Sequence, residues 1–400
     1  MKRTINFSPP DISESEIQEV VKVLKSGWIT TGPEVKAFEK KLADYIGVNQ
    51  AVCLNSATAA EELNLRILGI GPGDEVILPA YTYTATASAV LHTGASIKLV
   101  DSQKDSVEMD YDQLESAITS RTKVIIPVDL GGVPCNYERI YQAIEDKKEL
   151  FHPNNAIQNI YGRIIVCADA AHAFGSSRNG VMAGNIADFT SFSFHAVKNL
   201  TTAEGGAAVW RKNPKLDDAM LYRLYQLYSL HGQSKDALAK TKLGSWEYDV
   251  IGPWYKYNMT DLSAAIGLKQ LERYPDLLAR RHEIIRMYDQ AMDRMGIWHL
   301  NHFGDNYQSS GNLYLIRIPG ITEKQRNDFI TELSRCGIAA NVHYKPLPML
   351  TAYRALGFDI AQYPNAYHLY ENEITLPLHT QLSNDDVNYM IESIQTILKA

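Results

Sequence analysis

The chain has 400 residues, a length that is enough for one large domain or two ordinary ones with a sizeable buried core. Of these residues 45% are hydrophobic and 21% charged, as in an ordinary globular protein. A net charge of −7 argues against nucleic acid as a partner. No apolar run reaches the roughly 18 residues that a membrane-spanning helix needs. The polar, proline-containing start also differs from a secretion signal, so we expect a cytoplasmic protein with no membrane partner.

Four cysteines are scattered along the chain without the short spacing of a metal site: Cys53, Cys135, Cys167 and Cys336. Three of them stand within apolar stretches. We therefore expect reduced, mostly buried thiols and no metal ion.

The first 47 residues predict two helices. A capping box from Ser13 to Glu16 opens a helix that runs to about Lys25. A second helix follows Pro33 and stops at Gly47.

Short apolar runs then alternate with helical segments. The expected strands are Ala51–Leu54, Glu75–Leu78, Ser96–Val100 and Lys123–Val128, and the expected helices are Ala57–Leu68, Thr84–His92, Tyr111–Ile118 and Tyr137–Ile144. This alternation predicts an α/β fold, with crossover units on a largely parallel sheet that helices cover on both faces.

The pattern changes after this region. We interpret the polar segment 147–162 as a surface insertion, followed by three more strands near 163–168, 189–194 and 206–210. A long helical stretch, about Thr260–Met292, contains Pro275 and is expected to be bent or divided. The last part predicts strand Leu313–Ile318, helix Thr322–Cys336, strand Ile338–Val342 and a final helix from Asn384. We therefore expect a large α/β domain over 1–255, and a connecting helix with a small α+β domain over 256–400.

The segment that ends in Lys198 carries the clearest chemical signal. It reads Ser191-Phe-Ser-Phe-His-Ala-Val-Lys198 and is followed by Glu204-Gly205-Gly206, where the glycines are expected to let the backbone turn tightly. An apolar setting lowers the pKa of a lysine and makes its neutral amine available as a nucleophile. Taken alone, the segment also fits a surface lysine in a loop.

Asp169 and His172 follow a second apolar strand, at the edge where α/β sheets bind ligands. A carboxylate there would suit a heteroaromatic nitrogen that must stay protonated. The same residues also fit a helix cap and a packed core histidine.

Small residues between a strand and a helix, Ser56-Ala57-Thr58, predict an anion cradle of backbone N–H groups and hydroxyls. This signal is weak alone, because such turns are common. An amine, a carboxylate and an anion cradle together are what pyridoxal phosphate requires.

In these segments, and in Asn6-Phe-Ser-Pro-Pro and Ser26-Gly-Trp-Ile-Thr-Thr-Gly-Pro33, the chain resembles the DegT/DnrJ/EryC1/StrS family of pyridoxal-phosphate-dependent sugar aminotransferases. The resemblance covers essentially the whole chain. The resemblance implies fold type I of these transferases, with a mostly parallel mixed sheet in the large domain and a small C-terminal α+β domain. It also implies a homodimer with shared active sites, and a cofactor that passes through the pyridoxamine form.

The resemblance assigns roles residue by residue. Lys198 is implied to be the Schiff-base lysine and proton carrier, and Asp169 the catalytic partner of the ring nitrogen. The other implied cofactor contacts are His172 at the ring hydroxyl, Tyr83 stacked on the ring, and Ser193, Ser56, Ala57 and Thr58 at the phosphate.

A further segment, Trp254-Tyr-Lys256-Tyr-Asn258, matches a stretch that in the family reaches the neighbouring subunit's active site. Many relatives read Asn-Tyr-Arg there, so whether Lys256 or Asn258 contacts phosphate is open. The implied substrate residues are Thr30, His343 and Tyr344, although His343 also fits a packed histidine. Pro348 and Asp129 depart from the histidines that many relatives carry, which leaves the sugar contacts open.

The implied reaction is transfer of an amino group, from glutamate, to a nucleotide-linked keto-deoxysugar, with a 4-keto-6-deoxy sugar favoured. Lys198 argues against the dehydrating branch of the fold, which has histidine at that position. The alternatives are an aminotransferase for a cyclitol or other non-nucleotide ketone, and a non-catalytic regulatory protein that binds the cofactor. The nucleotide, the sugar, the carbon that is aminated and the pathway stay open.

Overall fold

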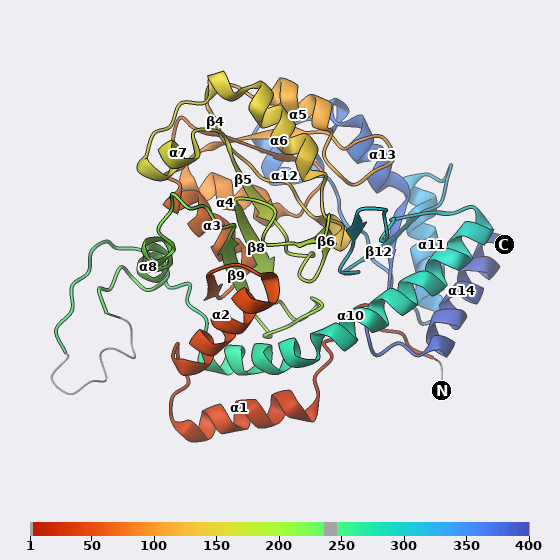
Figure 1. The fold of residues 1–400 in the computed structure, drawn as a ribbon. Helices are drawn as coiled ribbons and strands as arrows, with labels where there is room; N and C mark the ends of the chain where they lie inside the picture. The colour runs from red at the N-terminus through yellow and green to blue at the C-terminus, as the bar shows by residue number, and fades with distance from the viewer. Residues whose placement is uncertain (1–2, 236–245, 400) are drawn as a thin grey trace.

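The computed structural model describes residues 3–235 and 246–399, and its centre is a seven-stranded sheet in the order β1-β9-β8-β5-β4-β2-β3 (Figure 1). Of these strands only β9 runs antiparallel to its neighbours. The sheet consists of β1 (Ala51–Leu54), β2 (Glu75–Pro79), β3 (Ser96–Val100), β4 (Thr122–Ile125), β5 (Ile165–Asp169), β8 (Phe189–Ser193) and β9 (Gly206–Trp210). The predicted α/β class with a mostly parallel mixed sheet is confirmed.

Helices cover both faces of this sheet, as its fully buried strands require. The sheet-covering and N-terminal helices are α1 (Glu14–Ser26), α2 (Pro33–Ile46), α3 (Ala57–Ile67), α4 (Thr84–Thr93), α5 (Tyr111–Ala117), α6 (Tyr137–Asp146), α8 (Asp218–Ser229) and α10 (Asp261–Met295). Strand β1 shows the alternation: Val52 and Leu54 lie in the core under α3, whereas Ala51 and Cys53 face α2 and α10. Periodicity of two along each strand thus creates two separate cores.

The last hundred residues build a second, antiparallel sheet, β10-β12-β13, with its own core. Its elements are β10 (Trp298–His299), β12 (Tyr314–Arg317), α11 (Glu323–Arg335), α12 (Thr351–Ala355), α13 (Pro364–Asn372), β13 (Glu373–Leu376) and α14 (Asn384–Lys399). A third small sheet, β11-β6-β7, joins β11 (Tyr307–Gln308) to β6 (Ser177–Arg178) and β7 (Val181–Met182). Leu313 and Leu369 also pack into the core of the large sheet. The division at 255/256 stays a prediction.

Of the two predicted alternatives for the long helix at Pro275, bent or divided, division does not occur: α10 is one continuous helix of 35 residues. Two other local predictions are wrong. The segment 147–162 is not only a surface insertion, since it forms α7 (Ala156–Tyr161), where Ile157 and Gln158 are buried. Residues 338–342 form isolated bridges rather than a strand.

The cysteines match the expectation: all four are free thiols, and three of them are buried. In the part of the chain that the structure describes, no helix is both long and apolar enough to cross a membrane.

The start of α2 is tied to the start of α10 by one carboxylate. Gly32, the N-cap of α2, has no side chain that could cap the helix. Asp261 does this instead: Oδ1 accepts from the N–H groups of Gly32 at 2.8 Å and Val35 at 3.0 Å, and Oδ2 from that of Glu34 at 3.3 Å. The cap therefore also joins two helices that lie far apart in the sequence.

Replacing Asp261 by alanine is expected to lower the free energy of unfolding by about 2–4 kcal/mol, because three backbone donors lose their acceptor at once. Urea denaturation measures this. Asp110→Ala, which removes the half-buried N-cap of α5, is the control and is expected to cost about 1 kcal/mol. An Asp261→Ala loss no larger than that of the control would contradict the bridging role.

Candidate active site

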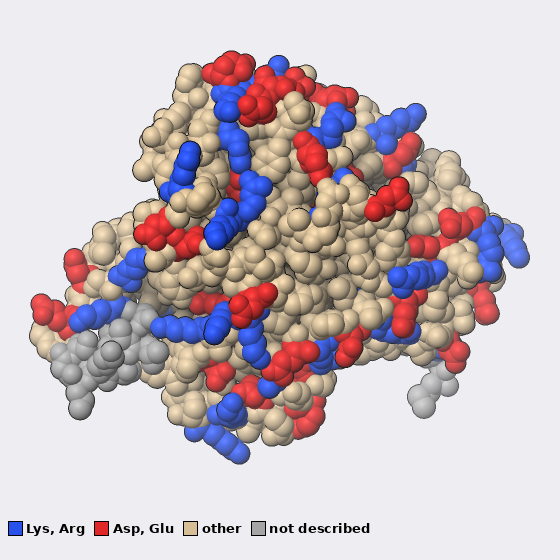
Figure 2. Space-filling model, viewed as in Figure 1, with Lys and Arg blue, Asp and Glu red and all other residues tan. Residues whose placement is uncertain are grey.

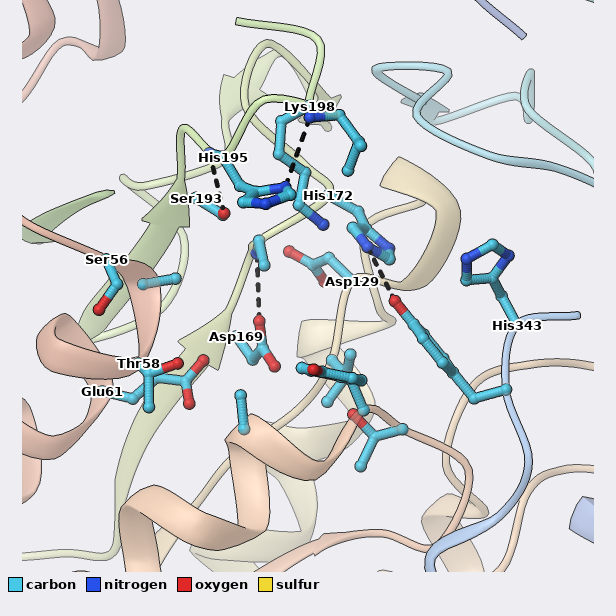
Figure 3. A pocket seen from close by; sticks show the side chains of 18 of the residues that line it. Ser56, Thr58, Glu61, Asp129, Asp169, His172, Ser193, His195, Lys198 and His343 are labelled. Carbon is cyan, nitrogen blue, oxygen red and sulfur yellow. Dashed lines mark hydrogen bonds between the residues drawn. The ribbon is translucent and has the colours of Figure 1, made fainter. Parts of the chain in front are cut away.

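A cavity of about 350 Å³ lies where the parallel strands of the large sheet end (Figure 3). Asp169 and Ser193 are the last residues of β5 and β8, while Tyr83 and Asp129 follow β2 and β4. Carboxyl ends of parallel strands meet at one edge, so residues far apart in sequence line one wall.

Lys198 lies in the loop between β8 and β9, and its side chain reaches into the cavity (Figure 3). The turn is fixed by the Lys198 N–H, which donates to the His195 carbonyl at 2.9 Å. Burial lowers the pKa of Lys198 from 10.5 to about 8, although the charge of Asp169 acts in the opposite direction. The neutral amine is therefore available near neutral pH.

Asp169 is buried, and its carboxylate is held in place by two donors. Oδ1 accepts from the Ala171 N–H at 3.1 Å, and Oδ2 accepts from the Thr86 hydroxyl at 2.7 Å. Neither donor is a cation. The carboxylate therefore keeps its negative charge available for a positively charged partner.

The start of α3, where the sequence predicts an anion cradle, lies at the cavity. Ser56 is the N-cap, and its hydroxyl accepts from the Ala59 N–H at 3.1 Å. The N–H groups of Ala57 and Thr58 have no acceptor within the helix, because they belong to its first turn. Ser56, Ala57, Thr58 and Ser193 all line the cavity.

The two glycines after Glu204 were expected to allow a tight turn, but the structure gives a different reason for glycine at residue 206. Neither Gly205 nor Gly206 has a positive φ, and the left-handed residue of this loop is Ala203. A Cβ on Gly206 would lie 2.4 Å from the carbonyl carbon of Ser56. Glycine is required because β9 passes directly beneath the anion cradle.

His172 is neutral and linked to Tyr344. Its Nδ1 accepts from the Gly131 N–H at 3.2 Å, so the proton is on Nε2, which lies 3.2 Å from the Tyr344 hydroxyl. Burial lowers the pKa of His172 well below its ordinary value, and nearby Lys198 lowers it further. The Tyr344 hydroxyl can therefore accept from His172 and still donate into the cavity.

His343 and Tyr83 complete the wall. Burial, and then Lys198, lowers the pKa of His343 to about 4, and its Nδ1 lies 2.9 Å from the Thr375 hydroxyl. The ring of Tyr83 lies 5.6 Å from that of Tyr344 and is more than half exposed, at 57%. The exposed face of Tyr83 is free to pack against a planar ligand.

Three predicted site residues do not line the cavity of their own chain: Lys256, Asn258 and Thr30. The Lys256 amine donates to the Asn258 side-chain oxygen, and Asn258 donates to the hydroxyl of Thr31. This group lies along the end of β1, where the Asn55 N–H donates to the Tyr257 carbonyl at 2.7 Å.

Sequence reasoning missed Glu61 and Thr86. Glu61 lines the cavity, and Thr86 donates to Asp169. Helical spacing held a signal for Glu61, because it lies one turn beyond Ala57 and Thr58 and so shares their face of α3.

Comparisons with known proteins agree with this geometry. Residues 10–395 match the model of the DegT/DnrJ/EryC1/StrS aminotransferase family. The spore coat polysaccharide biosynthesis protein SpsC of Bacillus subtilis is 38% identical, with 98% of this chain and 97% of that protein covered. The putative sugar aminotransferase Spr1654 from Streptococcus pneumoniae, solved in its pyridoxamine-phosphate form, is 56% identical with a TM-score of 0.97, covering 99% of both chains. PseC from Helicobacter pylori, an aminotransferase involved in pseudoaminic acid biosynthesis, is 28% identical with a TM-score of 0.86, covering 99% of this chain and all of that one.

The residues of the cavity fit pyridoxal phosphate. The free N–H groups at the start of α3 suit a phosphate, and they lie next to Gly206, where a Cβ would clash with Ser56. The Lys198 amine suits an aldehyde. Asp169 suits a protonated ring nitrogen. The same neighbour was also solved in its pyridoxal-phosphate form, at 54% identity and a TM-score of 0.96 over 99% of both chains.

A family match over nearly the whole chain, together with a cavity whose residues fit the family's cofactor, leads to one conclusion. This chain belongs to the DegT/DnrJ/EryC1/StrS aminotransferase family, and its cofactor is pyridoxal phosphate.

Proposed function

We propose that this protein transfers an amino group, from glutamate, to the keto group of a nucleotide-linked deoxysugar, with a 4-keto-6-deoxy sugar favoured. The observation that carries the proposal is the meeting of Lys198, Asp169 and the start of α3 in one cavity. Similarity to a putative sugar aminotransferase and to a polysaccharide biosynthesis protein supports a sugar as acceptor.

Lys198 and Asp169 divide the chemistry between them. Pyridoxal phosphate supplies the electron sink that stabilises charge on the carbon next to the amine. The Lys198 amine would hold the cofactor's aldehyde carbon at rest, and as a free amine it would carry a proton between the donor's α-carbon and that carbon. Asp169 would hold the ring nitrogen in its protonated form. The Ser56–Thr58 turn and Ser193 would bind the phosphate and fix the ring's orientation.

The remaining wall residues would contact the acceptor. His343 is neutral, and Tyr344 has a hydroxyl that can donate into the cavity, so both can hydrogen-bond sugar hydroxyls. Tyr83 would pack on the cofactor ring. His172 would hold Tyr344 in place, and the His172 side chain would also reach toward the hydroxyl of the cofactor ring.

We further propose a homodimer in which the Lys256–Asn258 segment and Thr30 complete the partner's site. These residues lie outside their own cavity, and the nearby chain carries apolar side chains in contact with solvent. Trp246 is 79% exposed, and Tyr248, Val250 and Ile251 are also exposed, in the extension beyond α8 (Figure 1). A second copy of the chain would cover this surface.

Capture of the cofactor by Lys198 is expected to depend on pH. Cofactor-free protein is mixed with pyridoxal phosphate and the product is trapped with borohydride. The rate of Lys198 labelling should increase with pH, and the midpoint of this increase should lie near pH 8, where the amine loses its proton. In Asp169→Asn this midpoint should be lower, because the charge that favours the ammonium is gone. Peptide mass spectrometry identifies the labelled lysine. A midpoint near 10.5, or an upward shift in the variant, would contradict this account.

Lys198→Ala is expected to fold but to lose amino transfer by about a thousandfold or more, because both the nucleophile and the proton carrier are removed. Asp169→Asn should bind cofactor yet slow proton transfer by on the order of a hundredfold. Glutamate half-reactions followed by absorbance, with thermal melts, measure both effects. Lys215→Ala, an exposed lysine outside the cavity, is the control. Wild-type turnover in Lys198→Ala would overturn the proposal.

Complementation tests the shared site. Lys198→Ala and Asn258→Ala proteins should each be inactive or weak, but co-expressed subunits should recover about a quarter of wild-type activity, because half of the dimers contain one intact site of two. Repeating the mixture with Lys256→Ala shows which residue is the contact across the interface. No recovery from either mixture, in samples that contain mixed dimers by mass spectrometry, would rule out sharing through these residues.

A further inference from the structure

Glu61 is a buried acid in the active-site wall for which the reaction outlined above has no use. It is 4% exposed and lies on α3, one turn beyond the anion cradle. Its Oε2 atom has no hydrogen-bond partner within residues 3–235 and 246–399. Such an unpaired buried oxygen requires an explanation.

The group that faces Glu61 is another acid. Figure 3 shows the Glu61 carboxyl pointing from α3 toward that of Asp169 on β5. Burial raises the pKa of Glu61 well above 4.5, and the charge of Asp169, followed by hydrogen bonding to Asp169, raises it further. Two carboxylates that face each other away from water cannot both be ionised, whereas one proton between them turns the repulsion into a hydrogen bond.

The surroundings decide which acid holds the proton. Asp169 already accepts from the Ala171 N–H and the Thr86 hydroxyl, which stabilise its negative charge, whereas Glu61 Oε2 has no donor. Lys198 is the only lysine or arginine among the described residues that line the cavity. Its charge interacts with Asp169, which also has the two donors, so Asp169 is the ionised acid of this pair and Glu61 the neutral one.

We propose that Glu61 and Asp169 act as one unit that retains a single proton, with Glu61 donating it in a hydrogen bond to Asp169. The unit then presents one negative charge, on Asp169, with its orientation fixed from three sides. Glu61 is a positioning residue that acts through Asp169. Its effect on the ring nitrogen rests on the function proposed above, whereas the retained proton does not.

Other titratable groups surround this unit from several elements. On β5, burial and then the charges of Asp188 and Glu61 raise the pKa of Cys167 well above its ordinary value, so Cys167 stays neutral. The titratable side chains around the cavity are Tyr83, Asp129, His172, His195, Lys198, Glu204, His343 and Tyr344. All of them are kept in a Glu61 variant, so comparison with the wild type isolates the proton of the unit.

The first test uses cofactor-free protein. The folded wild type retains a proton that its unfolded chain releases above pH 4.5, so its stability should fall as pH rises, until the unit itself ionises. Glu61→Gln has no such proton. The unfolding constant of the wild type, divided by that of Glu61→Gln, should therefore rise with pH, by up to about tenfold per pH unit in this window. Urea denaturation at several pH values measures the ratio.

Glu75→Gln provides the matched control. Glu75 is as buried as Glu61, but its carboxylate accepts from the Thr119 and Thr122 hydroxyls and pairs with Arg121. The unfolding constant of the wild type, divided by that of Glu75→Gln, should therefore not rise with pH. A flat ratio for Glu61→Gln as well would overturn the retained proton. That result would leave the proposed amino transfer untouched.

The second test reads the bound cofactor. Glutamine keeps a neutral side chain that can donate to Asp169, so the pH midpoint of the cofactor's visible absorption should be unchanged in Glu61→Gln. Methionine removes the donor, makes Asp169 more basic and should raise the midpoint by roughly half a pH unit or more. Equal shifts in the two variants would show a merely structural role and contradict the proposal. If the wild type bound no pyridoxal phosphate, the proposed function would fail, while the stability test would still decide whether the proton is retained.

Discussion

The structure depends on placing one ammonium and one carboxylate together, away from water, at the edge of a sheet. Removing either charge from solvent alone is costly, and the cost is reduced only if the two are held close to one another. Lys198 and Asp169 achieve this because β5 and β8 are adjacent and parallel, with Asp169 in register with Ser191. The burial that lowers the pKa of Lys198 is thus a consequence of strand order.

The rest of the site follows from the same edge. The helix that begins after β1 directs its first N–H groups into the cavity, and β9 can pass beneath it only because residue 206 is glycine. The C-terminal segment closes the opposite side with His343 and Tyr344. Charged side chains of both signs are interspersed over the face of the molecule seen in Figure 2, where no single-sign field dominates.

Periodicity and strand ends were enough to predict the sheet and its covering helices, and they marked three segments that the structure brings together in one cavity. The roles of those residues came from the family resemblance. These signals are local: apolar runs, capping boxes and small residues at a turn. What escaped prediction depends on distant contacts. Helix α10 continues through Pro275 while packed against α1 and α2, and Arg273 beside the proline pairs with Asp11 and Glu16. The cap of α2 comes from Asp261, and the partner of Glu61 comes from another layer of the fold.

The central claim is that this cavity transfers an amino group from glutamate to a sugar ketone. The most direct measurement is the visible absorption of the purified protein with pyridoxal phosphate, recorded before glutamate, after glutamate and after each of a panel of keto-sugar nucleotides and cyclitol ketones. The account predicts a band that bleaches with glutamate and returns with one sugar nucleotide. A return with a cyclitol ketone alone would contradict the proposed acceptor. A band that never responds would contradict amino transfer itself.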